Sequence, residues 1–335
     1  MKALAIRHYK AAMEVMELPR PEPGSGDLLV RVRAASVNPL DYKIRSGGVK
    51  VMIQYSFPLI LGNDLAGDVE AVGPGVTKFK VGDAIYSRLD RDRIGAFAEY
   101  ALVRESAAAA KPARLDYVQA ASLPLVGLTA WQALIDIARV RAGQKVLIHA
   151  GSGGVGTFAI QLGKHLGAEV VTTAGAKNHA LVKSLGADVA IDYRTTRFET
   201  VAKDQDVVFD TQGGETLLRS FDAVKPGGMV VTVGGRPDAK FARAWGLSLP
   251  LVWILGFLNR KVDRLAKQKR ARFEYLFMHA SGEQLAKIGA LVDQGVIRPI
   301  VDKTFSLPAA ADAVSYVESG RAVGKVVIRV ADSES

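Results

Sequence analysis

A glycine-rich turn between a short apolar strand and a helix is the feature that most constrains the fold of this chain. In the segment KVLIHA-GSGGVG-TFAIQLGKHLG, Gly151, Gly153 and Gly156 have G-x-G-x-x-G spacing. The first glycine allows a tight turn, the second a close approach of backbone to pyrophosphate, and the third close helix–strand packing. Because the helix N-terminus also offers free N–H groups to phosphate, the segment predicts a dinucleotide site rather than a ligand-free turn. The predicted contacts are Gly151, Ser152, Gly153, Gly154, Val155 and Gly156.

The segment after the second strand distinguishes NAD from NADP(H). NAD sites place Asp or Glu about 20 residues beyond the first glycine, where the carboxylate binds the ribose 2′-hydroxyl. Here VVTTAGAKNHA (170–180) contains no acid and offers the cation of Lys177 and the hydroxyl of Thr173. A carboxylate would repel a 2′-phosphate, so its absence beside a lysine favours NADP(H). An ordinary surface lysine is the alternative for Lys177, and His179 is interpreted as a helix-face histidine.

Strands and helices alternate around this turn. Beyond Ser122, short apolar strands alternate with helical segments, which predicts βαβ units and a parallel, doubly wound Rossmann sheet. The residues before Ser122 contain short strands separated by Gly, Pro and Asp, which is typical of a compact β domain. The segment 300–330 mixes strand and helix and is expected to complete that domain. The α/β chain is thus predicted to form a β domain from residues 1–122 and 280–335, and a Rossmann domain from residues 123–279.

The absence of cysteine narrows the possible chemistry. It excludes disulfides, a thiolate nucleophile and a zinc site built on sulfur. The N-terminus, MKALAIRHYK, has no apolar run behind its charges, so no secretory signal is predicted and cytoplasm is the default location. No segment reaches the roughly 18 apolar residues of a spanning helix. The nearest, GLSLPLVWILGFL (246–258), contains Pro250 and is interpreted as core or as the wall of a pocket.

The net charge of +10 is not spread evenly, because seven basic residues and only one acid lie in the stretch 260–272. A solvated helix face is the favoured interpretation of this stretch. The alternative is a contact surface for nucleic acid or an anionic membrane, because an apolar segment precedes it. The basic residues are Arg260, Lys261, Arg264, Lys267, Lys269, Arg270 and Arg272, against the single acid Asp263.

Longer stretches of the sequence resemble one known superfamily. The sequence resembles the cofactor domain of the medium-chain dehydrogenase/reductases in AGSGGVGTFAIQLGKHLGAEVVTTAG and in LGADVAIDY. It resembles the quinone-oxidoreductase branch in ASVNPLDYKIRSG (35–47), FPLILGNDLAGDVEAVGPGVTKFKVGDAIYS (57–87) and GAFAEYALV (95–103). The segments VNPLDYKI and LPLVGLTAWQAL are most similar to zinc-free, NADPH-dependent quinone oxidoreductases and alkenal/enone reductases. The resemblance covers residues 1–330 and implies a GroES-like fold for the β domain.

The sequence departs from the zinc alcohol dehydrogenases at their ligand positions. Where those enzymes carry a zinc-ligating cysteine, this chain has the stretch from Asn38 to Asp41. Where they carry Gly-His-Glu, it has Gly62–Asn63–Asp64, and their cysteine-rich structural lobe has no counterpart. The resemblance therefore implies no metal site, which argues against simple alcohol oxidation.

The resemblance also implies further cofactor contacts. Tyr193 matches a tyrosine beside the adenosine 2′-phosphate, and Thr129 lies where the family approaches the nicotinamide. Gly234 and Gly235 follow a strand at the carboxyl end of the sheet, and Lys325 is a candidate cofactor contact from the other domain. A purely structural role is the alternative for each.

The predicted activity is NADPH-dependent hydride transfer to quinones or α,β-unsaturated carbonyls. Hydride addition to these substrates gives a delocalised anion, which a few hydrogen bonds can stabilise without a metal. The candidate catalytic donors are Asn38, Tyr42 and Lys43, with Tyr55 a weaker candidate. An exposed helix start is the alternative for Tyr42 and Lys43.

Three further expectations concern His149, an alternative function and the oligomeric state. His149 lies within an apolar strand and is interpreted as a buried, hydrogen-bonded residue. A second functional hypothesis is a nucleotide-dependent protein that binds RNA or a membrane surface and has only vestigial reductase activity. A homodimer is expected from the family and from the RFEYLFM strand.

Overall fold

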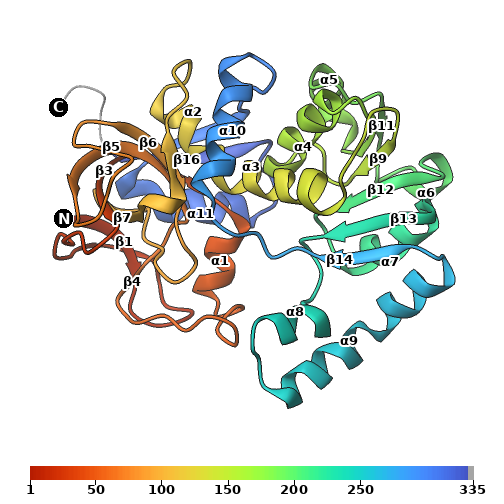
Figure 1. The fold of residues 1–335 in the computed structure, drawn as a ribbon, viewed down its shortest axis with the longest axis horizontal. Helices are drawn as coiled ribbons and strands as arrows, with labels where there is room; N and C mark the ends of the chain where they lie inside the picture. Colours follow the sequence, from red (N-terminus) through yellow and green to blue (C-terminus); the bar gives the residue numbers. More distant parts are fainter. Residues whose placement is uncertain (331–335) are drawn as a thin grey trace. The chain divides into compact units, whose positions relative to one another are not determined.

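The chain folds into two structural units, and each β-sheet lies within one of them. The computed structural model describes residues 1–330 (Figure 1). Unit 1 consists of Met1–Leu128 together with the C-terminal segment that begins at His279, and unit 2 consists of Thr129–Met278.

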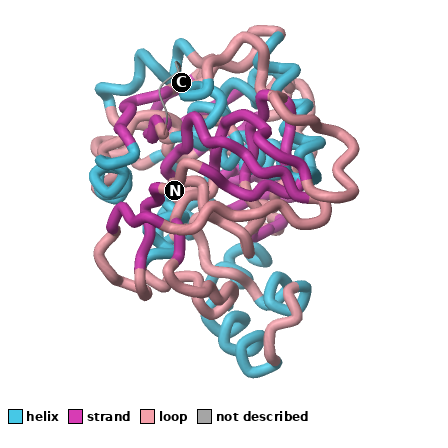
Figure 2. Tube along the Cα trace, turned by 90° about the vertical axis from the view of Figure 1, so that its left-hand side faces the viewer, coloured by secondary structure: helices cyan, strands magenta, loops and turns pink. Residues whose placement is uncertain are grey.

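The main sheet of unit 1 is mostly antiparallel and has the strand order β15-β16-β3-β5-β6-β8, with β7 also paired to β3. Figure 2 shows the strands of the protein in magenta. The long central strand DLLVRVRAASV is almost entirely buried, because β16, β5 and β7 pair along its edges and helices α2 (Tyr117–Ala121) and α11 (Ala310–Glu318) pack on it. The strands are β3 (Asp27–Val37), β5 (Asp64–Val72), β6 (Ala84–Arg88), β7 (Tyr100–Arg104), β8 (Ala108–Ala110), β15 (Val301–Ser306) and β16 (Lys325–Arg329). The pairing of β16 with β3 confirms that the C-terminal segment completes the N-terminal β domain.

Unit 1 also contains a smaller antiparallel sheet and several helices. The small sheet has the order β2-β1-β4. Its strands are β1 (Lys2–Ile6), β2 (Glu14–Glu17) and β4 (Leu59–Ile60). The helices are α1 (Pro39–Arg45), α2 (Tyr117–Ala121), α10 (Gly282–Asp293) and α11 (Ala310–Glu318).

The sheet of unit 2 is parallel throughout and has the order β11-β10-β9-β12-β13-β14. The chain starts in the middle and winds outward in both directions, so the predicted doubly wound sheet is confirmed. Its inner strands are short apolar runs buried on both faces, as expected of a parallel sheet. The strands are β9 (Lys145–Ile148), β10 (Glu169–Thr173), β11 (Val189–Ile191), β12 (Gln205–Asp210), β13 (Val224–Thr232) and β14 (Arg272–Tyr275).

Helices connect the strands of unit 2. The predicted helix after Ser122 begins as α3 and continues as a π-helical segment over Gln132–Ile137. The boundary between the two units lies within α3 (Pro124–Trp131). The α-helices of unit 2 are α4 (Gly154–His165), α5 (His179–Ser184), α6 (Phe198–Val201), α7 (Gly214–Ala223), α8 (Ala239–Ala244) and α9 (Leu249–Gln268). Within residues 1–330, no helix combines the length and the apolar character needed to cross a membrane.

Of the two interpretations of residues 246–258, core is wrong, and the wall of a pocket stays a prediction. Most of this segment forms the first half of α9, and Val252 is its only fully buried residue. Trp253 and Phe257 are 77% and 61% exposed. A single helix packed on one side can bury only one stripe of its surface, so an apolar run this long leaves large side chains outside.

Candidate cofactor and substrate sites

The glycine turn of unit 2 follows β9 and leads into α4. Ala150 carries the left-handed backbone conformation, with φ of +52°. Gly151 is needed for space instead, because an added Cβ would lie 2.0 Å from Thr172 Oγ1. The turn is tied to the neighbouring strand β10 by the Gly151 N–H, which donates to the Thr173 carbonyl at 2.9 Å.

The other two glycines of the motif have different surroundings. A Cβ at Gly156 would lie 2.2 Å from the Ala150 carbonyl oxygen and 2.6 Å from Gly151 Cα, so helix α4 can pack on the turn only without a side chain there. Gly153 is the N-cap of α4, and a Cβ on it would meet only the Ala150 oxygen, at 3.4 Å. The free N-terminal N–H groups of α4 and the open side of Gly153 fit a pyrophosphate, so these residues fit a dinucleotide.

A side-chain hydrogen bond joins this turn to the segment after β10. Asn178 Nδ2 donates to Ser152 Oγ at 3.0 Å. Lys177, next to Asn178, is exposed. The predicted pyrophosphate contact and the predicted 2′-phosphate contact are therefore brought to the same end of the sheet.

Arg194 adds a second cation at this end of the sheet, and the sequence reasoning missed it. A Cβ on Gly175 would lie 3.8 Å from Arg194 Cζ, so the guanidinium lies against the backbone just beyond β10. The guanidinium also lies 5.6 Å from the ring centre of Tyr193, which is 58% exposed. Arg194 follows β11, and the carboxyl ends of neighbouring parallel strands meet at one edge. That rule applied to the residues after AIDY would have identified it.

Thr173 and His149 form hydrogen bonds next to the glycine turn. Thr173 is buried, and its Oγ1 accepts a hydrogen bond from the Ala150 N–H at 3.0 Å and lies 3.2 Å from His149 Nδ1. His149 Nε2 lies 3.1 Å from Ser220 Oγ. Burial, together with the nearby Arg219, lowers the pKa of His149 to about 3, so its ring is neutral. The interpretation of His149 as buried and hydrogen-bonded is confirmed, and a phosphate contact of Thr173 stays a prediction.

The predicted nicotinamide-side residues lie at the carboxyl end of β13 and in α3. The N–H groups of Gly234 and Gly235 both lie 3.1 Å from Thr232 Oγ1, and that hydroxyl donates to Asp210 at 2.7 Å. Thr129 is buried within α3. These contacts hold the glycine pair in a defined loop, and the cofactor contacts of the three residues stay predictions.

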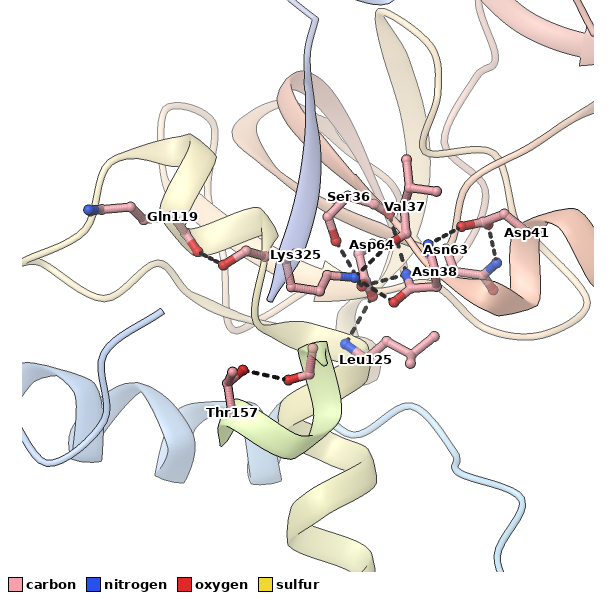
Figure 3. Close-up of polar contacts among 12 residues, drawn as sticks. Ser36, Val37, Asn38, Asp41, Asn63, Asp64, Gln119, Leu125, Thr157 and Lys325 are labelled. Atoms are coloured by element: carbon pink, nitrogen blue, oxygen red, sulfur yellow. Dashed lines mark hydrogen bonds and ion pairs between the residues drawn. The ribbon is translucent and has the colours of Figure 1, made fainter. Parts of the chain in front are cut away.

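Unit 1 contains a buried polar network built by strand register (Figure 3). In β3, Ser36 pairs with Asp64 of β5, and Val37 pairs with Val326 of β16. This register brings Asp64 and Lys325 next to Asn38, the residue that follows β3 and caps α1. Asn38 and Asp64 are 1% and 0% exposed, and Lys325 is 5% exposed.

The side chains of this network form hydrogen bonds and an ion pair with one another. Lys325 Nζ donates to Asn38 Oδ1 at 2.5 Å and to the Val37 carbonyl at 2.8 Å, and lies 3.7 Å from Asp64 Oδ2. Asn38 Nδ2 donates to Asp64 Oδ2 at 2.8 Å and to the Ser36 carbonyl at 3.3 Å. A substrate contact of Asn38 and a cofactor contact of Lys325 stay predictions.

A second carboxyl group, Asp41, adjoins the network. Its Oδ2 accepts from the Asn38 N–H and its Oδ1 from Asn63 Nδ2, both at 2.7 Å. Burial raises the pKa of Asp41 to about 7, with these hydrogen bonds opposing the shift. Asp41 was not among the predicted site residues, although a carboxylate at the third position of α1 is typical of a helix capping box.

Tyr42 and Lys43, the other predicted donors, lie on α1. Tyr42 is half-buried against the hydrophobic core of unit 1, and burial raises the pKa of its hydroxyl. Lys43 is exposed. Tyr55 donates to the Arg91 carbonyl at 2.7 Å, and burial raises its pKa to about 12. Their roles toward a substrate stay predictions.

Comparison with known proteins matches both parts of the chain. Residues 24–113 match the alcohol dehydrogenase GroES-like domain, and residues 185–328 match the zinc-binding dehydrogenase family. The chloroplastic NADPH-dependent alkenal/one oxidoreductase of Arabidopsis thaliana is 34% identical, over 98% of this chain and 79% of its own. The quinone oxidoreductase of Coxiella burnetii has a TM-score of 0.86 and 34% identity, over 99% of each chain. A mycobacterial protein solved with NADPH has a TM-score of 0.79 and 28% identity, over 98% of this chain and 100% of its own.

A doubly wound sheet with a glycine turn, joined to an antiparallel GroES-like unit, defines a nucleotide-dependent oxidoreductase. Identity to curated relatives over nearly the whole chain narrows this class further. The chain belongs to the medium-chain dehydrogenase/reductase superfamily, in the branch of the quinone oxidoreductases and alkenal reductases.

The residues of the buried network do not fit the zinc that one matched family name implies. The ammonium group of Lys325 lies within 2.5 Å of Asn38 Oδ1 and 3.7 Å of Asp64 Oδ2, and it would repel a divalent cation held by those atoms. Within residues 1–330, no cluster of three or more His, Cys, Asp or Glu side chains is arranged to hold a metal ion. The cation that lies next to Asn38 and Asp64 is the ammonium group of Lys325.

Proposed function

We propose that this protein is an NADPH-dependent reductase of quinones or α,β-unsaturated carbonyl compounds. The observation that carries the proposal is the pair of cations, Lys177 and Arg194, beside a glycine turn that the Ser152–Asn178 hydrogen bond joins to the same strand end. A 2′-phosphate carries the negative charge that distinguishes NADPH from NADH, and cations with N–H donors bind it strongly. The relative from Arabidopsis thaliana is named for its NADPH dependence.

The residues of unit 2 would each hold one part of the dinucleotide. Backbone N–H groups from Ser152 to Gly156 would bind the pyrophosphate, and Lys177, Arg194 and Tyr193 would surround the 2′-phosphate. Thr129 and the Gly234–Gly235 loop would bound the nicotinamide end. When bound, NADPH supplies a hydride from its nicotinamide ring.

The proposed substrate class follows from the hydrogen-bond donors that unit 1 provides. Reduction of an isolated carbonyl places full negative charge on one oxygen and favours a Lewis acid, whereas an enone or quinone spreads that charge over several atoms. Hydrogen-bond donors are then sufficient, and Tyr42 and Lys43 are the proposed donors. Asn38 would hold the start of α1 in place through its bonds to Asp64 and Lys325.

The experiment is a panel of quinones, enones and simple alcohols assayed with NADPH and with NADH, with metal content measured on the same sample. We expect turnover of quinones or enones with NADPH, weak turnover with NADH, none with alcohols, and no stoichiometric zinc. Tyr42→Phe should lower kcat about 10-fold or more without changing the KM for NADPH, whereas Lys50→Gln, an exposed neighbour, should change neither. Faster oxidation of NADH, or full activity in Tyr42→Phe, would overturn the corresponding part of the proposal.

We also propose that two chains pair through β14. This strand lies at the end of the sheet order, so its outer backbone groups are not bonded within the sheet of unit 2. The test is light scattering of the wild type and of Phe273→Pro. A dimer that becomes a monomer in the variant supports edge pairing, and an unchanged mass contradicts it.

A further inference from the structure

The outward face of α9 has two different halves. In its first half, large apolar side chains protrude at positions i, i+4, i+5, i+8 and i+9, which lie on one side of a helix. They are Leu249 (71% exposed), Trp253 (77%), Ile254 (54%), Phe257 (61%) and Leu258 (45%). Single exposed apolar residues are common, but a contiguous group this large is typical of a binding surface.

The opposite side of α9 fixes the helix to unit 2. Val252, Asn259 and Val262 are buried, and Asn259 Nδ2 donates to the Pro237 carbonyl at 2.8 Å. Val262 belongs to the core cluster of unit 2. The apolar outward face is therefore held in a fixed orientation by contacts that do not involve it.

The second half of the outward face is cationic. Arg260, Lys261, Arg264 and Lys267 are all exposed, and within residues 1–330 none of the four forms an ion pair. Asp263 is the only acid in α9. The Arg260 guanidinium lies 4.0 Å from the ring centre of Phe257, which joins the two halves into one continuous surface.

We propose that this face of α9 binds the surface of an anionic lipid bilayer. The helix has 20 residues and spans about 30 Å, so an apolar half and a cationic half of similar length suit a helix that lies obliquely in the interface. Tryptophan and phenylalanine partition into the boundary between headgroups and acyl chains, and lysine and arginine bind anionic headgroups. The net charge of +10 adds long-range attraction to such a surface. The proposal does not depend on the substrate of the enzyme.

The experiment is flotation of the full-length protein with vesicles of phosphatidylcholine alone or mixed with phosphatidylglycerol. We expect binding to the anionic vesicles only, weakened by added salt. The double variant Trp253→Gln/Phe257→Gln and the triple variant Arg260→Gln/Arg264→Gln/Lys267→Gln should each lower the bound fraction about 10-fold. Both variants should unfold at the same temperature as the wild type, because the altered side chains are exposed.

Matched controls remove the same chemistry elsewhere. Val81→Gln/Val201→Gln replaces two exposed apolar side chains, and Lys50→Gln/Lys78→Gln/Lys80→Gln removes three exposed cations. Both controls should float like the wild type. A blue shift of tryptophan fluorescence on vesicle binding, absent in Trp253→Phe, would place α9 itself in the interface.

Three outcomes would overturn the proposal. The first is no flotation with anionic vesicles, and the second is equal loss of binding in the α9 variants and in the controls. The third is a different partner on this face of α9. In that case the wild type would self-associate or bind RNA but not vesicles, and the α9 variants would lose that association.

Discussion

Asn178 donates a hydrogen bond from Nδ2 to Ser152 Oγ across 3.0 Å, and this contact joins the glycine turn to the segment after β10. The two ends of the bond belong to the parts that would bind different phosphates of one dinucleotide. The bond restrains Asn178, the residue after Lys177. A dinucleotide with a 2′-phosphate would therefore bind two backbone segments that are already joined before it arrives.

We expect this hydrogen bond to couple the two phosphate sites. Ser152→Ala and Asn178→Ala should each weaken NADPH binding several-fold, and the double variant should be no weaker than the worse single variant. The corresponding coupling energy is about 0.5–1.5 kcal/mol. Calorimetric titration with NADPH measures all four proteins. Additive losses would show that the two residues act independently.

Two glycines of the motif should respond differently to alanine. Gly156→Ala forces a Cβ to 2.2 Å from a backbone oxygen, so we expect a loss of stability of about 1–3 kcal/mol or more. Gly153→Ala meets only one atom, at 3.4 Å, and should cost about 1 kcal/mol or less while weakening NADPH binding about 10-fold. Urea unfolding and NADPH titration separate the two effects. Equal stabilities for both variants would contradict the packing described for Gly156.

The buried ion pair between Lys325 and Asp64 should contribute strongly to the stability of unit 1. Lys325→Met leaves Asp64 without its cation in a dry site, and we expect a loss of about 3–5 kcal/mol. Asp64→Asn added to Lys325→Met should recover part of that loss, because the carboxylate that lost the lysine ammonium group is then removed. The matched control is Lys80→Met, at an exposed site, which should change the urea midpoint little. A Lys325→Met protein as stable as the wild type would refute this role of the pair.

His149 should make the protein sensitive to acid. Its pKa is about 3 in the folded chain against an ordinary value of 6.5, so the unfolded chain binds a proton more readily between these values. The stabilisation is complete above pH 6.5 and is lost as the pH falls toward 3, by about 1.4 kcal/mol for each pH unit. Asp41, whose pKa is raised to about 7, acts in the opposite direction, because its stabilisation is lost as the pH rises toward 7.

The contribution of His149 is therefore measured as a difference between two proteins. Between pH 6.5 and pH 4.5, the wild type should lose about 2–3 kcal/mol more than His149→Gln, which has no group that titrates here. Parallel pH dependences of the two unfolding free energies would show that folding does not lower the pKa of the imidazole.

The sequence predicted the architecture of this chain well, because its signals are local. A glycine turn between strand and helix, followed by alternating apolar runs, determines a doubly wound sheet through short-range geometry. The return of the last strand to the N-terminal unit was also predictable, since a strand after the final helix needs a sheet to join. Residue types alone thus lead to the fold class and to the cofactor turn.

Contacts between distant segments were not predictable from the sequence. Lys325 and Asn38 meet only because β16 pairs with β3 in one register, and no local pattern encodes that register. Arg194 was missed because it lies one strand away from the expected position of the phosphate. The apolar half of α9 was interpreted as core or as the wall of a pocket, because hydrophobicity alone does not distinguish a buried helix from an exposed binding face.

The central claim is that a 2′-phosphate is recognised by Lys177 and Arg194, and paired titrations with NADPH and NADH test it most directly. We expect the wild type to bind NADPH at least about 10-fold more tightly than NADH. The double variant Lys177→Gln/Arg194→Gln should bind both with the affinity of the wild type for NADH, while the exposed control Lys183→Gln keeps the preference. Equal affinities in the wild type, or a preference for NADPH that survives in the double variant, would contradict the account.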